Sequence, residues 1–355
     1  MISPALVSWN GIATVARHEF RLRLRAGRWR WILGIWFAVL LAFTALLREA
    51  LVTSNSPKIG TPMFGGLMLF LLGLGLLVVP ALTSQSVNGD RERGVLASLQ
   101  VTLLTPADIA LGKLLAAWAT AAVFVLVSVP MVVWAMIEGG VGFLQAVVTL
   151  FVVVILLGIV CAIAQCFSAI FLRGTTSAVM SYVAVFVLTV GSVIGFGLAA
   201  SATSEYVEKM YRFPACAEEG HLDSIHPETC VNPDGSTTPA QWHTERYAAN
   251  RPQFEKVWWL LAPNPFVILA DAAPTAPPYL DRSGRLVAND LDPMTGIANS
   301  VESTRRPPYE PAQSVVPAWT VGLAMDVLIG ALAVATTIRR LRAPAGVLGR
   351  GVRIA

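Results

Sequence analysis

Long apolar stretches separated by short polar segments dominate the chain. The hydrocarbon core of a bilayer is about 30 Å thick, so a helix needs roughly 20 apolar residues to cross it. Six stretches have that length and are apolar on every side, which favours lipid-immersed helices over amphipathic surface helices. They cover approximately Trp31–Leu47, Met63–Thr83, Leu114–Ile137, Val141–Leu172, Thr176–Ala200 and Val316–Ile338. The pattern predicts an all-α membrane protein with six transmembrane helices.

Composition supports a membrane protein. The 355 residues are 55% hydrophobic and 14% charged, and the mean hydropathy is +0.63. Soluble globular proteins carry about 25% charged residues, and the same numbers exclude disordered and collagen-like chains. Residues 201–316 hold 15 acidic and nine basic residues, whereas the rest of the chain has a net charge of +10. This distribution predicts one large aqueous insertion, residues 201–315, between spans five and six.

The basic residues predict the orientation. Fifteen Arg or Lys residues lie before span one, after span six, or in the loops after spans two and four. Arg48 and Lys58 are the only basic residues in the other short loops. By the positive-inside rule both termini and the loop 84–113 are cytoplasmic and the insertion 201–315 is outside. The 30 residues before span one exceed a usual signal-peptide n-region, so we expect that span to be retained.

The segment before span one predicts a helix over residues 12–28, on the cytoplasmic surface within a 1–30 region. Arg17, Arg21, Arg25 and Arg28 recur at helical spacing and form a basic stripe, whereas Arg23 falls outside it. Such a helix can contact a cytoplasmic partner, or it can be held by anionic lipid headgroups at about 1 kcal/mol per basic residue. The sequence alone favours the lipid interpretation. A basic tail, 339–355, follows span six.

The loop 84–113 carries the most informative pattern. A charged cluster, Asp90 to Arg93, precedes a predicted short helix with leucines on one face. Thr105-Pro106 ends that helix or begins another, because proline suits a first helical turn and restrains the residue before it. The run from Ile109 through Gly112-Lys113 then leads into span three.

These residues closely resemble the intracellular loop of type-2 ABC-transporter permeases, the ABC-2 family. The resemblance covers Glu92-Arg93-Gly94, the leucine-bearing helix, Thr105-Pro106 and the Leu-Gly-Lys run, together with the arginine-rich elbow helix, the six spans and the basic tail. It does not cover the insertion. The chain departs from the family at Val95 and Ala97, where Thr and Glu are usual, and its loop helix is about one turn longer.

The resemblance implies that the loop carries a coupling helix that docks into an ATP-hydrolysing subunit. The leucines would supply the apolar contact, and Glu92 and Arg93 would set the orientation. The residues so implicated are Glu92, Arg93, Gly94, Leu96, Leu99, Leu103, Thr105 and Pro106. Spans two and five would line a central cavity in a dimer with a second permease subunit, identical or different.

The chain carries no recognisable ATP site of its own. Its only Gly-Lys pair, Gly112-Lys113, is followed by Leu114 rather than Ser or Thr, and Ala107 stands where the first P-loop glycine would be. A phosphate cradle needs both features. We therefore expect a non-enzymatic transport subunit that binds no cofactor or metal and no nucleic acid, with ATP and Mg²⁺ bound by the partner ATPase.

Three further features stay open from sequence. Asp326, near the middle of span six, either lines a pathway or relays a proton, or makes a structural hydrogen bond. Cys216 and Cys230 favour a disulfide on the oxidising side over a metal site with His221 and His226. The apolar segment Val257–Ala270 is expected to dip into the outer leaflet, or to be a buried element of an exterior domain.

Two other functions compete with the permease interpretation: a membrane-anchored exterior binding or sensor protein, and a proton-coupled secondary transporter using Asp326. The lack of recognisable inverted repeats disfavours the second. The preference for Arg, 22 of 26 basic residues, is typical of a high-GC bacterial genome, which places the expected protein in a bacterial plasma membrane. The transported substrate is not predicted.

Overall fold

The computed structural model describes residues 8–25, 27–53, 59–92, 94, 104–214, 229–231, 237–239, 242–273, 279–280, 286–287, 292–305 and 316–342. Contacts divide the chain into two compact units. One comprises Met1–Gly195 with Trp258–Ala355, and the other comprises Phe196–Val257. The first unit is a helical bundle, and the second contains the strands that follow span five.

Six helices among the described residues are long and apolar enough to cross a membrane, which confirms the six predicted spans. These spans run over Trp29–Thr53, Gly60–Glu92, Pro106–Ile137, Phe143–Ile170, Gly174–Ala202 and Ala318–Leu341. The individual helices in them are α2 (Arg28–Thr53), α3 (Gly60–Thr83), α4 (Asn88–Glu92), α6 (Pro106–Val127), α7 (Val129–Ile137), α8 (Phe143–Ile170), α9 (Gly174–Phe186), η1 (Val187–Gly191), α10 (Ser192–Ala202) and α14 (Ala318–Leu341).

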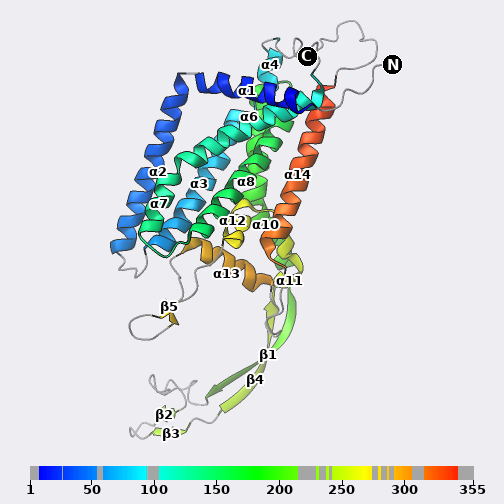
Figure 1. Ribbon diagram of the computed structural model, residues 1–355. Helices are drawn as coiled ribbons and strands as arrows, with labels where there is room; N and C mark the ends of the chain where they lie inside the picture. The colour runs from blue at the N-terminus through cyan, green and yellow to red at the C-terminus, as the bar shows by residue number, and fades with distance from the viewer. Residues whose placement is uncertain are drawn as a thin grey trace. The chain divides into compact units, whose positions relative to one another are not determined.

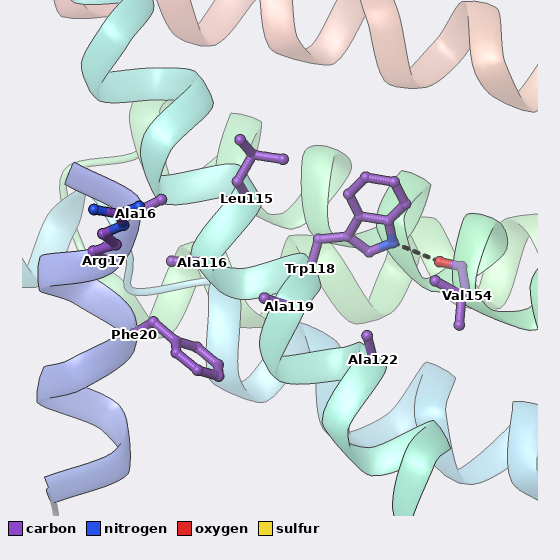
Figure 2. Close-up of a pocket in the computed structure, with 9 residues that line it drawn as sticks. All are labelled: Ala16, Arg17, Phe20, Leu115, Ala116, Trp118, Ala119, Ala122 and Val154. Carbon is purple, nitrogen blue, oxygen red and sulfur yellow. Dashed lines mark hydrogen bonds between the residues drawn. The ribbon is translucent and has the colours of Figure 1, made fainter. Parts of the chain in front are cut away.

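A further helix, α1 (Trp9–Arg25), lies across one end of the bundle (Figure 1). The helix predicted over 12–28 therefore starts and ends three residues too late, because α2 begins a separate helix at Arg28. Helix α1 packs on the start of α6, and α6 packs on α8. On that second contact, Trp118 Nε1 of α6 donates a 2.7 Å hydrogen bond to the Val154 carbonyl of α8 (Figure 2).

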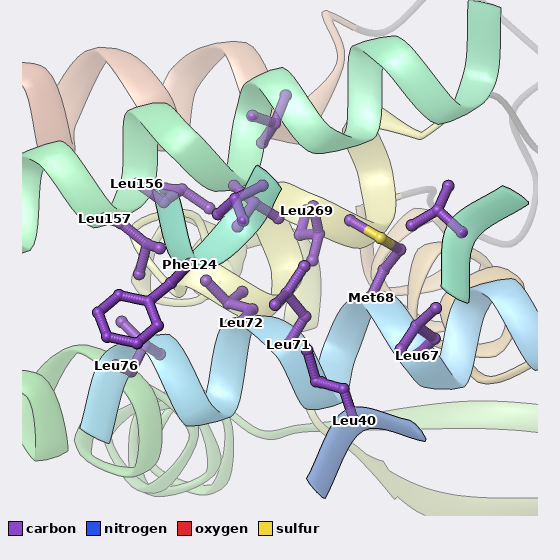
Figure 3. Packing of buried hydrophobic residues seen from close by; sticks show 14 of the residues in the cluster. Leu40, Leu67, Met68, Leu71, Leu72, Leu76, Phe124, Leu156, Leu157 and Leu269 are labelled. Atoms are coloured by element: carbon purple, nitrogen blue, oxygen red, sulfur yellow. The ribbon is translucent and has the colours of Figure 1, made fainter. Parts of the chain in front are cut away.

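The core of the bundle is built around α3. Its side chains Leu67, Met68 and Leu71 are fully buried, and they meet Phe124 of α6 and Leu156 of α8 within one apolar cluster (Figure 3). Proline ends α6 at a kink: Pro130 lies in the first turn of α7, and Ser128 Oγ donates to the Val125 carbonyl at the junction. Proline has no backbone N–H, so it cannot donate the hydrogen bond that would continue α6.

Short helices precede span six at the end of the bundle opposite α1 (Figure 1). They are η3 (Trp258–Leu260), α12 (Pro265–Ala272) and α13 (Pro293–Arg305), and two-residue strands β5 (Tyr279–Leu280) and β6 (Leu286–Val287) pair nearby in sequence. Ile268 and Leu269 of α12 are completely buried in the bundle core. The apolar segment of the insertion is thus part of the helical unit and not of a separate exterior domain.

The second unit corrects the all-α prediction. Strands β1 (Glu205–Pro214) and β4 (Trp242–Arg251) form a ten-residue antiparallel pair that runs from Glu205↔Arg251 to Pro214↔Trp242. Strands β2 (Thr229–Val231) and β3 (Thr237–Pro239) form a second antiparallel pair, and α11 (Phe254–Val257) follows β4. Strand β1 is rich in Tyr, Val and Phe, which fit a pleated surface. All-α therefore describes the spans but not the insertion.

Candidate functional site

The start of α6 is fixed by a capping box. The Asp108 N–H donates to Thr105 Oγ1 at 3.1 Å, and the Thr105 N–H donates to Asp108 Oδ2 at 2.9 Å. Pro106 occupies the first turn. These two bonds satisfy N–H groups that the helix itself leaves without partners. Of the two interpretations of Thr105-Pro106, the structure therefore selects a helix start.

The same carboxylate joins α6 to α1. Asp108 Oδ1 accepts the Ser8 N–H at 2.9 Å, just before α1 begins. One turn later, a Cβ added to Gly112 would lie 2.6 Å from the Cβ of Val15 on α1. Any larger residue at position 112 would hold the helices apart, so glycine is what allows α1 to lie directly on α6.

A buried lysine then joins three helices. Lys113 of α6 is 2% exposed, and its Nζ forms ion pairs with Glu19 of α1 and Asp90 of α4. The two carboxylates are 21% and 16% exposed. A lysine that is removed from water needs such partners, because an unpaired buried charge is strongly destabilising. We call Glu19, Asp90, Lys113 and Arg23 the charge cluster.

Arg23 completes the charge cluster from α1, four residues after Glu19 and therefore on the same helix face. Burial lowers the pKa of the Arg23 guanidinium, and the nearby Glu19 carboxylate raises it in part. Two acids and two bases give the cluster no formal net charge. Arg23 is the arginine that the sequence placed outside the exposed stripe, and its half-buried position explains why.

Other contacts fasten the loop to the spans. The N–H groups of Val87 and Asn88, at the start of α4, both donate to Ser168 Oγ of α8 at 3.1 Å. Ser177 Oγ of α9 donates to the Ser84 carbonyl at 2.8 Å. Gln165 Nε2 of α8 donates to the Ala110 carbonyl at 2.8 Å. Each end of the loop is therefore bonded to at least one other span.

An apolar cluster backs these hydrogen bonds. Val87 from the loop packs with Ile109 of α6, Ala169 of α8 and Leu341 at the end of α14. All four are nearly or completely buried. Side chains of the loop, α6, α8 and α14 thus pack together at the end of the bundle that carries α1. Moving one of these elements would disturb the others.

The predicted coupling residues are only partly described. Glu92, the last residue of α4, and Gly94 are exposed, whereas Thr105 and Pro106 are half-buried. Gly94 has φ +71°, a conformation that side chains with a Cβ rarely adopt. Arg93, Leu96, Leu99 and Leu103 lie outside the described residues.

The predicted basic stripe is largely on the surface. Arg17, Arg21 and Arg25 are exposed on α1, and no acidic side chain in the described part of the chain forms an ion pair with them. Arg28 begins α2, and its side chain lies outside the description. The stripe is therefore free to meet an anionic surface or partner, unlike Glu19 and Arg23 on the inner face of α1.

Span six carries the predicted buried carboxylate. Asp326 is 2% exposed, and its Oδ1 accepts no hydrogen bond among the described residues. It shares one face of α14 with the small residues Gly322, Gly330 and Ala333, and α14 packs on α8. A buried polar atom without a partner is costly. Asp326 is therefore a buried carboxylate in span six whose Oδ1 the described hydrogen bonds do not account for.

Span five contains a π-helical turn, η1, between α9 and α10. Asn264, the N-cap of α12, donates from Nδ2 to the Thr189 carbonyl at 2.7 Å and to Ser192 Oγ at 2.9 Å. A π turn displaces a carbonyl from the regular ladder, and such turns often occur at functional sites. Only 6% of the most apolar stretch of this span is buried, compared with 61% in span four.

The four cysteines divide between the described and the undescribed side chains. Cys216 lies outside the described residues, as does the side chain of Cys230 in β2, so their disulfide stays a prediction. Cys161 and Cys166 are free, buried thiols on α8. Within the described ranges no group of three or more His, Cys, Asp or Glu residues has the geometry to hold a metal ion.

Comparison with known proteins adds no relative. The chain matches no protein-family model and no curated protein sequence. The structure shows a helical bundle in which six helices are long and apolar enough to cross a membrane, with the charge cluster at one end.

Proposed function

We propose that this chain is the membrane-spanning permease subunit of an ATP-driven ABC exporter of the ABC-2 type. A separate ATPase subunit would bind ATP and Mg²⁺ and drive substrate export across a bacterial plasma membrane. In this proposal the end of the bundle that carries α1 faces the cytoplasm, as do both termini. The loop 84–113 is then the contact with the ATPase.

The charge cluster carries this proposal. A loop that transmits force must be attached stiffly to the helices that it moves. Lys113 ties the loop residue Asp90 and the α1 residue Glu19 to the start of span three, while Ser168 holds the start of α4 to span four. A push on α4 would therefore tilt α1 and the spans together, which supports rigid-body coupling.

The exposure of span five supports a second permease subunit. Only 6% of its most apolar stretch is buried in a single chain, and a Cβ added to Gly195 would meet no described atom within 4 Å. The row Gly191, Gly195 and Ala199 leaves room for a helix from a second copy or a related chain. Spans two and five of the two subunits would then enclose the transport pathway.

Leu96→Asp tests the coupling contact. We expect the variant to reach the membrane at the wild-type level, but the permease-stimulated activity of the co-purified ATPase to be lost, because a charge replaces the apolar contact. Ser300→Asp adds the same charge to an exposed position of α13, at the opposite end of the bundle, and should leave the stimulation unchanged. Unchanged stimulation in Leu96→Asp would contradict the loop assignment.

Asp326 favours one alternative, a proton-coupled secondary transporter, because its buried Oδ1 has no partner among the described residues. Affinity purification of the full chain from its native membrane separates the two functions. An ABC permease brings an ATP-hydrolysing subunit with it in stoichiometric amount. A secondary transporter brings none, and its transport survives ATP depletion but stops when the proton gradient is collapsed.

A further inference from the structure

A groove lies where α1 crosses the start of span three. Its volume is about 470 Å³, and it is lined by side chains from α1, α6 and α8 (Figure 2). This volume is within the range of about 300–1,000 Å³ that is usual for small-molecule sites. Phe20 of α1 points toward α6 in this view, and Trp118 forms the far wall of the groove.

The lining is apolar and preformed. Alanines at positions 16, 119 and 122 leave the space that larger side chains would fill. Trp118 cannot swing into the groove without losing its hydrogen bond to the Val154 carbonyl, and its ring also lies against Gly158, where an added Cβ would be 2.7 Å from Trp118 Nε1. The groove is therefore part of the helix packing and not a gap that a side chain closes.

One charged residue lines the groove, and it is Arg17. Arg21 lies one turn further along the same exposed side of α1. Glu19, the nearest acidic residue in the sequence, is paired with Lys113 on the inner face and does not neutralise Arg17. The groove thus has an almost wholly apolar lining, with the exposed cation of Arg17 beside it on α1.

A second cavity provides an internal comparison. About 290 Å³ in volume, it lies on the other side of Trp118 between α6, α8 and α14. Its lining is also apolar, but it contains no charged residue. Of these two cavities, the groove under α1 is the one that combines an apolar lining with a basic residue, which is the arrangement that recognises an anionic amphiphile.

We propose that the groove between α1, α6 and α8 binds an anionic phospholipid of the adjacent leaflet, with an acyl chain against Phe20 and Trp118 and the phosphate on Arg17. Helix α1 lies across the end of a bundle of membrane spans, so the channel opens at the depth of the acyl chains and Arg17 at the depth of the headgroups. This proposal assumes only that the chain spans a membrane. It holds or fails independently of the ATPase partner.

The test titrates the purified full chain, freed of lipid in detergent, with phosphatidylglycerol or phosphatidylcholine of identical acyl chains, and detects bound lipid by native mass spectrometry. Arg17→Gln should weaken phosphatidylglycerol binding about fivefold, the effect of one basic residue at an anionic headgroup, and should weaken phosphatidylcholine less, because its choline cation offsets the charge of the phosphate. Arg25→Gln removes an exposed charge that does not line the groove, and should change neither.

Filling the groove tests the acyl-chain contact separately. Ala119 is exposed on the groove wall, so Ala119→Phe should fold normally and reduce the binding of both lipids. Ala331→Phe makes the same change at an exposed position of the second cavity, and should reduce neither. The proposal is overturned if Arg17→Gln behaves as Arg25→Gln, if Ala119→Phe behaves as Ala331→Phe, or if glycerol phosphate alone competes as well as the lipid.

Discussion

Replacing Lys113 by methionine tests whether the charge cluster holds α1, α4 and α6 together. Methionine keeps the length and apolar stem of the side chain but removes the charge, which leaves Asp90 without its cation and Glu19 with only the half-buried Arg23 nearby. Removing one partner of a buried ion pair typically costs about 3–5 kcal/mol. Because the two carboxylates are 21% and 16% exposed, water can screen them in part, and we expect about 3 kcal/mol.

Thermal unfolding of the full chain in detergent measures this loss. A destabilisation of about 3 kcal/mol should lower the melting temperature of Lys113→Met by about 4 °C. Lys256→Met is the matched control, since Lys256 is exposed and surface substitutions usually stay within about 0.5 kcal/mol.

A neutral cluster separates charge from shape. The quadruple variant Glu19→Gln, Arg23→Gln, Asp90→Asn, Lys113→Met removes every charge of the cluster, so it should recover most of the stability that the single variant loses. The reasoning is refuted if Lys113→Met and Lys256→Met have the same melting temperature. It is also refuted if the quadruple variant is no more stable than the single one, because the loss would then come from packing alone.

Two further predictions use the same unfolding assay. Gly112→Ala should destabilise the fold by about 1–3 kcal/mol, because the new Cβ would lie 2.6 Å from the Cβ of Val15. In the control Gly34→Ala, the new Cβ has no atom within 4 Å, so this variant should stabilise α2 by up to about 1 kcal/mol. Equal effects of the two variants would contradict the close contact at Gly112. Burial raises the pKa of the Asp292 carboxyl, although hydrogen bonds from Thr295 and Met294 lower it in part. A raised carboxyl pKa means that Asp292 weakens the fold as pH rises through that pKa. Asp292→Asn can still cap α13, so the variant should be more stable than the wild type by a larger margin at pH 7 than at pH 3. A margin that does not depend on pH would contradict this cause.

The sequence predicts the spans because the signal for them is local. An apolar run of sufficient length identifies a membrane helix wherever its neighbours lie, and all six predicted spans are present. Thr105-Pro106 left two interpretations open from sequence, and the capping box that Asp108 completes decides for a helix start. The ten-residue pairing of β1 with β4 was missed, because a polar, acidic insertion with short apolar alternation has no strong period of either kind.

The charge cluster could not be predicted in the same way. Lys113 and Glu19 are 94 positions apart in the chain, and nothing near either residue indicates the other. The available signal was indirect: Arg23 breaks the arginine stripe, and Lys113 stands at the start of an apolar helix where it needs a partner. A lysine at that position is equally compatible with an exposed side chain that reaches the headgroups.

The three sides of α1 explain how one helix can serve both the loop and the lipid. Ile12 and Val15 are buried against the bundle, and Glu19 continues that face toward Lys113. Phe20 lies beside it on the groove, and Arg21 lies on the exposed side. If a partner displaces α4, either the ion pairs of Lys113 break or α1 follows. Breaking them leaves buried charges unpaired at about 3 kcal/mol or more, whereas shifting a surface helix along lipid exchanges one apolar contact for another. Movement of α1 is therefore the less costly response, and it would carry Phe20 and Arg17 across the groove.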